Sequence, residues 1–224
     1  MQKYAVIVAG GSGTRMKREI PKQFIPLAGK PILMHTLNAF YEAEPQINLI
    51  LVLPESQVLG WRSLCADYDF TPPHKIVHGG KTRFHSVKNG LNEIKGEGLV
   101  AIHDGVRPLV DKEIIQNAYK VAEQEGNAVV AVGLKDSIRW TDQESNKVVN
   151  RNDYRLIQTP QTFRVSVIKT AFQTEFKEWF TDDATVLETT GAAIHLIEGS
   201  YRNIKITTPE DLQVAEAFLK ARSE

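Results

Sequence analysis

The sequence contains a single cysteine, Cys65, among 224 residues. One cysteine cannot form a disulfide within the chain, and it excludes a zinc site built from several cysteines. The histidines add no metal-binding pattern, because none of them falls into the spacing H-E-x-x-H. A chain without disulfides is typical of the reducing cytoplasm, so we expect a cytoplasmic protein.

Long apolar runs and an excess of charge are also missing. No stretch approaches the roughly 20 apolar residues that a membrane helix needs. The N-terminus MQKYAVIVAGG has no signal-peptide pattern. Lys and Arg together number 27 and Asp and Glu together number 27, so the formal net charge is zero. A neutral chain has no overall field that attracts nucleic acid or an anionic membrane. We therefore expect a soluble protein that binds neither.

Short apolar, β-branched runs alternate with longer amphipathic stretches along the chain. Strands are predicted at YAVIVA, INLILVLP, KIVHGG, GLVAIHD, NAVVAVGL, AIHLIEG and NIKI, and helical segments separate most of them. This alternation predicts an α/β fold whose doubly wound, mostly parallel, Rossmann-like sheet is covered on both faces. Residues 1–224 should form a single domain, because the length and the 42% hydrophobic content suit one core. Thr208, followed by Pro209 and Asp211, predicts the start of a final helix.

One polar segment, about residues 135–163, interrupts this alternation. It reads as two short strands around an Asp-Gln-Glu-Ser-Asn turn, which predicts a β-arm that protrudes from the domain. Apolar residues on such an arm need a partner surface, and a second copy of the chain is the simplest one. These residues are Ile138, Trp140, Val148, Val149 and Tyr154. The arm therefore predicts a homodimer.

Polar clusters follow or lie near the ends of the predicted strands. They are AGGSGTRM, HGGKTRFHS, HDGVRP, GLKDS and NIKIT, the last of which places Lys205 within a late strand. In open α/β sheets, ligands bind outside the carboxyl ends of the strands. We therefore expect these clusters to converge on one site.

The first of these clusters favours a polyphosphate ligand. Gly10, Gly11 and Gly13 allow the backbone to approach an anion closely. Arg15 and Lys22 add full positive charges at the same place. An ordinary glycine-rich turn between a strand and a helix is the structural alternative for the glycines alone.

Two common nucleotide-binding motifs are absent from this region. Met16 stands where G-x-G-x-x-G needs its third glycine, which argues against a redox enzyme of the Rossmann type. Pro31 follows Gly29-Lys30 where a Walker loop needs Ser or Thr. The cluster is therefore an anion site of another kind.

HDGVRP offers a carboxylate and a guanidinium at the end of one strand. Asp104 can hold a divalent metal or a sugar hydroxyl, and Arg107 can clamp a phosphate. Equally, Asp104 can cap the next turn and Arg107 can pair with it. Taken separately, Arg151 and Thr181 are compatible with a solvated residue and a helix cap.

Together the motifs resemble one enzyme family over essentially the whole chain. GGSGTRM, PKQF, GG-x-x-R-x-x-S, HDGVRP, KDS, TPQTF, TDDA and NIKIT occur in the order found in cytidylyltransferases that join CTP to a sugar-alcohol phosphate. The resemblance is greatest to the 2-C-methyl-D-erythritol 4-phosphate cytidylyltransferases of non-mevalonate isoprenoid biosynthesis. It implies a nucleotidyltransferase that uses CTP and Mg²⁺, or another divalent cation, to make 4-diphosphocytidyl-2-C-methyl-D-erythritol and pyrophosphate.

The resemblance also implies roles for individual residues. The nucleotide would bind at Gly10, Gly11, Ser12, Gly13, Arg15, Lys22, Gly80, Arg83 and Ser86. The sugar-alcohol phosphate would bind at Asp104, Arg107, Ser137, Arg151, Thr159, Thr181 and Lys205, and Asp104 is the candidate metal ligand. Catalytic roles are implied for Arg15, Lys22, Arg151 and Lys205. In the family, the arm arginine reaches the active site of the other subunit, which implies the same for Arg151.

Departures from the family pattern leave alternatives open. Gly10-Gly11 stands where many of these enzymes have two alanines, and Ser137 replaces a usual threonine. Lys81-Thr82 stands where acidic residues are frequent. The Gly-Gly form and HDGVRP also occur in ribitol-5-phosphate cytidylyltransferases, which are the main alternative. A non-catalytic nucleotide-binding protein is the alternative from another class, and the retained charged positions argue against it.

Overall fold

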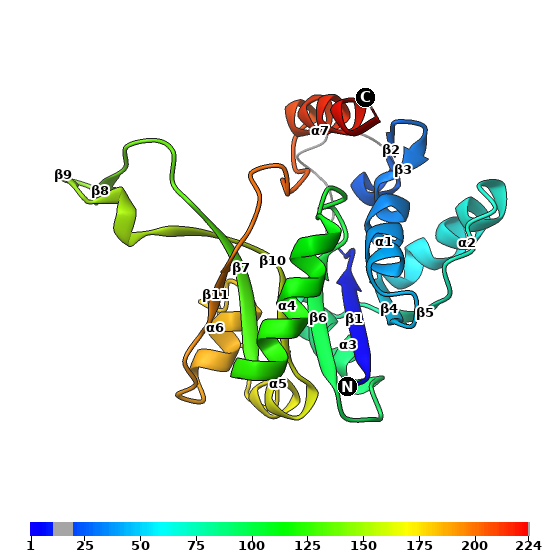
Figure 1. The fold of residues 1–224 in the computed structure, drawn as a ribbon, viewed down its shortest axis with the longest axis horizontal. Helices are drawn as coiled ribbons and strands as arrows, with labels where there is room; N and C mark the ends of the chain where they lie inside the picture. Colours follow the sequence, from blue (N-terminus) through cyan, green and yellow to red (C-terminus); the bar gives the residue numbers. More distant parts are fainter. Residues whose placement is uncertain (11–19, 224) are drawn as a thin grey trace.

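The chain folds around a seven-stranded sheet in the order β11-β7-β10-β6-β1-β4-β5 (Figure 1). The computed structural model describes residues 1–10 and 20–223. The strands are β1 (Lys3–Val8), β4 (Asn48–Leu53), β5 (His74–His78), β6 (Leu99–Asp104), β7 (Asn127–Gly133), β10 (Arg155–Arg164) and β11 (Leu196–Glu198). Strand β10 runs antiparallel to both of its neighbours, and the other pairings are parallel. The predicted α/β, Rossmann-like class is confirmed.

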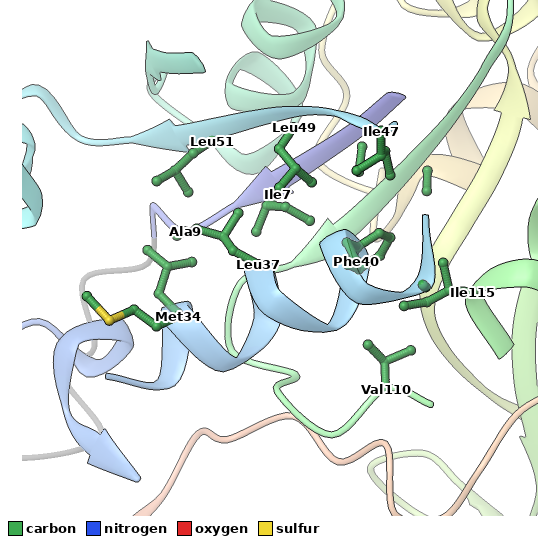
Figure 2. Packing of buried hydrophobic residues seen from close by; sticks show 14 of the residues in the cluster. Ile7, Ala9, Met34, Leu37, Phe40, Ile47, Leu49, Leu51, Val110 and Ile115 are labelled. Atoms are coloured by element: carbon green, nitrogen blue, oxygen red, sulfur yellow. The ribbon is translucent and has the colours of Figure 1, made fainter. Parts of the chain in front are cut away.

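Helices cover both faces of this sheet. They are α1 (Ile32–Ala43), α2 (Val58–Asp67), α3 (Arg83–Asn92), α4 (Lys112–Glu125), α5 (Val165–Ala171) and α6 (Asp183–Glu188). Helix α7 (Pro209–Ser223) packs instead in a separate cluster with Leu27 and Val106. Neighbouring residues of β1 point to opposite faces. Ile7 packs with Phe40 and Ile115 in the cluster beneath α1 and α4 (Figure 2). Val6 packs with Phe84 in the cluster beneath α3, α5 and α6. The sheet is therefore buried between two hydrophobic layers.

Local sequence explains how two of the helices are placed. A Cβ atom at Gly90 of α3 would lie 2.6 Å from Cγ1 of Val6, so glycine lets this helix approach β1 closely. Helix α7 begins with the predicted capping box, in which Asp211 Oδ2 accepts a 2.8 Å hydrogen bond from the backbone N–H of Thr208. Leu212 of α7 packs with Ile206 in a third cluster. No described helix combines the length and the apolar character needed to cross a membrane.

The β-arm is shorter than the segment 135–163 that the sequence predicts. Strands β8 (Arg139–Thr141) and β9 (Asn146–Val148) form an antiparallel hairpin far from the sheet (Figure 1). The 3-10 helix η4 (Arg151–Asp153) follows, and the rest of the segment is β10 in the sheet. Polar residues of β10, including Gln161 and Thr162, are nevertheless fully buried. Because of these polar residues, the sequence of this core strand reads as that of an exposed strand.

The predicted strand at NIKI is also wrong, because residues 203–206 are irregular. The carbonyl of Asn203 accepts a hydrogen bond of 2.8 Å from Nη1 of Arg107. The backbone N–H of Ile206 donates to the carbonyl of Val106 at 2.9 Å. These bonds fasten the segment to the loop after β6, so Lys205 reaches the site from a loop rather than from a strand.

The remaining short elements lie around the start of α1 and α2. They are the 3-10 helices η2 (Lys22–Phe24) and η3 (Glu55–Gln57) and the two-residue strands β2 (Pro26–Leu27) and β3 (Lys30–Pro31). Helix η2 places Lys22 and Gln23 beside the end of β1, because Gln23 Nε2 donates to the carbonyl of Ala9 at 2.8 Å.

Candidate active site

A cavity of about 390 Å³ opens at the carboxyl ends of β1 and β6. Its lining comes from four distant parts of the sequence, as expected for a ligand site in an open α/β sheet. The lining residues are Val8, Ala9, Gly10, Lys22, Gln23, Gly80, Lys81, Thr82, Arg83, Ser86, Asp104, Val106 and Lys205. Four of these side chains are cationic and one is a carboxylate, so the described part of the cavity attracts anions.

One wall of this cavity is the turn between β5 and α3. Thr82 caps α3, and its backbone carbonyl accepts a 3.0 Å hydrogen bond from the Ser86 hydroxyl. The same hydroxyl accepts from the backbone N–H of Gly80 at 3.0 Å. A Cβ atom at Gly80 would lie only 2.4 Å from the Cβ of His85, so the turn requires glycine there. Gly80 and Ser86 thus form a rigid, close-packed surface.

Asp104 lies at the centre of a cluster of cations. Its carboxylate oxygens lie 3.0 Å from Nζ of Lys205, 3.4 Å from Nε of Arg107 and 3.5 Å from Nε of Arg83. Burial would raise the pKa of Asp104, but the charges of Arg83, Lys205 and Arg107 hold it well below its usual range. Asp104 is therefore ionised at neutral pH and holds these three cations together.

Arg83 is paired more closely with Asp183 than with Asp104. Its two terminal nitrogens donate to the two oxygens of Asp183 at 2.8 and 2.7 Å. Burial opposes a charge on Arg83, but the carboxylates of Asp183 and Asp104 hold its pKa above the ordinary value. Asp183 is buried at the start of α6. The predicted nucleotide-binding Arg83 lines the cavity, but its guanidinium is already engaged by protein.

Gln161 positions the start of α6 next to this pair. Its side-chain oxygen accepts from the backbone N–H groups of Asp183 and Ala184 at 3.0 and 2.8 Å. Its side-chain nitrogen donates to Asp182 Oδ2 at 2.9 Å. Asp182, rather than Thr181, caps the helix by accepting from the backbone N–H of Thr185. Thr181 is therefore not needed as a helix cap.

A second cavity, of about 280 Å³, adjoins the first. It is lined by Arg83, Asp104, Arg107, Ile157, Gln158, Thr159, Gln161, Thr181, Asp182 and Lys205. Arg83, Asp104 and Lys205 line both cavities. Two anionic groups bound in the two cavities would therefore meet at the same cations.

His103 lies beneath both cavities and is fully buried. Burial lowers its pKa to about 4, so the ring is neutral near pH 7. Its two ring nitrogens lie within hydrogen-bonding distance of Thr159 Oγ1 and of the carbonyl of Arg107. The ring is enclosed by protein and lines neither cavity among the described residues.

The two cavities bring together most of the residues that the sequence predicts for a site. They are Gly10, Lys22, Gly80, Arg83, Ser86, Asp104, Arg107, Thr159, Thr181 and Lys205. Ser137 and Arg151 line neither cavity of their own chain. They flank the hairpin of β8 and β9, which lies away from the sheet in Figure 1. Arg151 is exposed and its Nη1 donates to the carbonyl of Lys135. Gly11, Ser12, Gly13 and Arg15 lie outside the described residues.

Sequence reasoning missed several polar residues that support the site from beneath. They are Gln23, His103, Gln161, Asp183 and Asn203. Each is buried, and each holds a neighbouring loop or strand by hydrogen bonds. They occur in the motifs PKQ, HDG, TPQ, TDD and NIK, each of which also contains a predicted site residue. A polar residue in the same motif as a predicted site residue was therefore the signal that could have identified them.

No group of three or more His, Cys, Asp or Glu side chains that could hold a metal is present among the described residues. Among the described residues that line the first cavity, Asp104 is the only carboxylate. Mg²⁺ is usually held by one or two carboxylates together with substrate phosphates and water. The site therefore fits a magnesium ion that arrives with a triphosphate, rather than one held by protein alone.

Known proteins resemble this chain over nearly its whole length. The 2-C-methyl-D-erythritol 4-phosphate cytidylyltransferase family matches residues 4–221. The enzyme of that name from Phocaeicola vulgatus is 48% identical over 219 residues, which cover 98% of this chain and 100% of that protein. The one from Azobacteroides pseudotrichonymphae is 49% identical and covers 97% of this chain and 99% of that protein.

Solved structures of such enzymes have the same fold. The 4-diphosphocytidyl-2C-methyl-D-erythritol synthase from Anaerococcus prevotii superposes with a TM-score of 0.83 at 28% identity, covering 98% of each chain. The 2-C-methyl-D-erythritol 4-phosphate cytidylyltransferase from Thermus thermophilus gives 0.77 at 28% identity, covering 98% of this chain and 100% of that one. The chain therefore belongs to the 2-C-methyl-D-erythritol 4-phosphate cytidylyltransferase family.

Proposed function

We propose that this enzyme transfers the cytidylyl group of CTP to 2-C-methyl-D-erythritol 4-phosphate. The products are 4-diphosphocytidyl-2-C-methyl-D-erythritol and pyrophosphate. One observation carries the proposal besides family membership: two adjoining cavities share Arg83, Asp104 and Lys205 at the carboxyl edge of the sheet. A reaction between two phosphate compounds needs two neighbouring sites with cations between them.

CTP is assigned to the first cavity. Gly10 and Lys22 line it at the end of β1, where the triphosphate would lie. The family resemblance implies that Gly11, Ser12, Gly13 and Arg15 bind the same triphosphate, and these four residues lie outside the described part of the chain. Gly80 and Ser86 form the wall made by the turn between β5 and α3, where the base would lie. Arg83 supports that wall through its pair with Asp183.

The acceptor is assigned to the second cavity. Arg107, Lys205 and Thr181 line it with Thr159, and Asp104 lies where the two cavities join. The acceptor phosphate would lie beside Lys205, which also lines the nucleotide cavity. This arrangement would bring the attacking oxygen close to the α-phosphorus of CTP.

In this mechanism, an oxygen of the acceptor phosphate attacks the α-phosphorus in line, and the bond to the departing pyrophosphate breaks. The attacking phosphate is already ionised near neutral pH, so no general base is required. The chain's own contribution is to hold the two substrates and to offset their mutual repulsion with Arg15, Lys22 and Lys205. The neutral, enclosed His103 takes no proton from the substrate.

Mg²⁺ is the proposed cofactor, with Asp104 as its protein ligand. When bound, the ion would neutralise charge on the triphosphate. We expect that removal of divalent cations with EDTA abolishes pyrophosphate release and that added Mg²⁺ restores it. Activity that persists in EDTA would contradict this assignment.

We also propose that two copies of the chain associate through the arm and that the enzyme works in the cytoplasm. Trp140, Val148 and Tyr154 are large apolar residues that are exposed on or beside the arm. A second copy would cover them and would bring Ser137 and Arg151 to a neighbouring acceptor cavity. This supplies a role for two predicted site residues that lie outside the cavities of their own chain.

The test is pyrophosphate release measured for each of four nucleoside triphosphates with each of several acceptors. The acceptors are 2-C-methyl-D-erythritol 4-phosphate, ribitol 5-phosphate and a sugar 1-phosphate. We expect kcat/KM for CTP with the methylerythritol compound to exceed every other pair by about a hundredfold or more. A preference for ribitol 5-phosphate would support the sister activity instead, and no turnover with any pair would support a non-catalytic protein.

A further inference from the structure

His103 spans the loop HDGVRP from within the core. Its Nε2 lies 3.1 Å from the carbonyl oxygen of Arg107, and its Nδ1 lies 3.0 Å from Oγ1 of Thr159. The ring packs edge-on against Phe40, with 4.9 Å between the ring centroids. It has no exposed surface. Each ring nitrogen therefore has one polar partner, and water has no access to either.

These partners determine the tautomer of the ring. A carbonyl oxygen can only accept, so Nε2 must carry the hydrogen that it donates to Arg107. In a neutral ring the other nitrogen is then an acceptor, so Nδ1 receives the hydroxyl hydrogen of Thr159. The Thr159 oxygen in turn accepts from the backbone N–H of Asp104 at 3.1 Å. These hydrogen bonds form one continuous series from Asp104 through Thr159 and His103 to Arg107.

This series of hydrogen bonds determines which groups the Thr159 hydroxyl can bind. Its hydroxyl has one hydrogen, and that hydrogen is directed at His103. Although Thr159 lines the acceptor cavity, it has no donor left for a phosphate oxygen. At neutral pH the oxygens of a phosphate monoester accept hydrogen bonds, and only a remaining proton on the phosphate could donate one. Thr159 would therefore be a poor direct ligand of the acceptor phosphate.

The same hydrogen bonds hold Asp104 and Arg107, which line the acceptor cavity. Asp104 is held through its backbone N–H, and Arg107 through its carbonyl. Arg107 additionally holds the segment that carries Lys205, through the carbonyl of Asn203. The buried ring of His103 thus supports both Asp104 and Arg107, which pair with each other in the charge cluster.

We infer that His103, as the Nε2–H tautomer, is a positioning residue that directs the Thr159 hydroxyl away from the acceptor and holds Asp104 and Arg107 in place. Thr159 acts through His103 and not by binding the acceptor phosphate. The assignment of the cavity to an acceptor rests on the proposed function, whereas the tautomer and the bond direction do not.

The first test is independent of activity. In protein labelled with ¹⁵N-histidine, the ring nitrogen signals at pH 7.5 report the tautomer of each of the six histidines. His103→Gln identifies the signals of His103 by their disappearance. We expect the Nε2–H tautomer, with the Nδ1 signal displaced in Thr159→Val and unchanged in Thr162→Val. An Nδ1–H tautomer, or an Nδ1 signal that ignores Thr159→Val, would overturn the inference.

Thr162 is a matched control for Thr159. It lies on the same strand, is fully buried, and its hydroxyl has no hydrogen-bond partner within the described part of the chain. Exchange of its hydroxyl for the methyl group of valine should therefore leave kcat, KM and the melting temperature close to the wild-type values. Melting curves for all variants establish that each is folded before kinetics are compared.

The second test is a double-mutant cycle on kcat and on KM for the acceptor. His103→Leu and Thr159→Val should each lower kcat about tenfold, and the double variant should lose no more than the single ones. His103→Gln, which can both donate and accept, should recover part of the loss. Additive losses, or a loss in Thr159→Val confined to the acceptor KM, would mean that Thr159 binds the acceptor directly. If no acceptor supports turnover, the proposed function fails while the NMR result still decides the inference.

Discussion

Lys22 and Lys205 reach the same cavity from opposite ends of the chain. Cations that surround a transferring phosphoryl group act on charge that develops in the transition state, so their loss affects turnover more than binding. The residue scale is therefore where the chemistry of this enzyme can be tested most directly.

Lys22→Ala should lower kcat by about a hundredfold to a thousandfold while weakening CTP binding only modestly. Lys30→Ala is the matched control, because Lys30 is exposed nearby in the sequence and lines neither cavity of the site. Steady-state pyrophosphate release and CTP titration separate the two effects. Near-normal turnover in Lys22→Ala would remove this lysine from the mechanism.

A second prediction at this scale concerns the charge pair between the half-buried Arg83 and the buried Asp183. Asp183→Asn should lower the free energy of unfolding by about 3 kcal/mol, because it removes the fully buried carboxylate that is the main partner of a guanidinium only 30% exposed. The estimate is at the low end for buried pairs, since Arg83 also lies 3.5 Å from Asp104. Urea unfolding measures the change.

Glu93→Gln provides the comparison for that measurement. Glu93 pairs with the exposed Lys75, and surface pairs of this kind contribute little to stability because water screens them. Equal effects of Asp183→Asn and Glu93→Gln would show that the buried pair adds nothing to stability. Residue types in the sequence predicted that Arg83 and Asp104 belong to one site, but not that Arg83 pairs with Asp183, one hundred positions away.

Among the secondary-structure elements, α7 offers the cleanest test of a local sequence signal. Burial would raise the pKa of Asp211, but hydrogen bonds from Thr207 and Thr208 lower it below its usual value. A lowered pKa in the folded state means that the ionised form stabilises the fold. This contribution is present above the pKa of the unfolded chain and is lost as the pH falls through the folded value.

Asp211→Asn should therefore lower the free energy of unfolding by about 1 kcal/mol at pH 7 and by less at acidic pH. Glu216→Gln, an exposed change in the same helix, should have little effect at either pH. Thermal unfolding at a series of pH values makes the comparison. A pH-independent loss in Asp211→Asn would mean that the carboxylate charge is not what stabilises the start of α7.

Elements with local signals were predictable, and those defined by distant partners were not. Apolar runs identified β1, β4 and β6, and the capping box identified the start of α7. Strand β10 was missed because its buried polar side chains are matched by partners on other elements, such as the start of α6 for Gln161. NIKI has the composition of a strand, but Arg107 and Val106 occupy two of its backbone groups.

At the scale of the whole molecule, the arm separates Arg151 from the cavities of its own chain. If Arg151 serves a neighbouring subunit, Arg151→Ala and Lys22→Ala chains should complement each other. Random mixing makes half of the dimers hybrid, and one of the two sites in each hybrid is intact. The mixture should then recover about a quarter of wild-type turnover.

The control uses an Arg139→Ala chain in place of the Arg151→Ala chain. Arg139 is an exposed arginine on the same arm. Arg139→Ala alone should retain activity, so it marks the effect of changing the arm without changing the site. Refolding the two chains together ensures exchange, and tagged chains verify that hybrids form. Verified hybrids without activity would exclude a site shared between subunits. The sequence indicated that an arm exists, but its direction relative to the site depends on the folded sheet.

The two cavities have three residues in common, Arg83, Asp104 and Lys205. A ligand that changes the position or charge of a shared residue must alter the affinity of the other cavity. Thermodynamic linkage requires the effect to be reciprocal: the factor by which CTP changes acceptor affinity equals the factor by which the acceptor changes CTP affinity. The shared wall therefore makes the two substrates effectors of each other, before any bond between them is made.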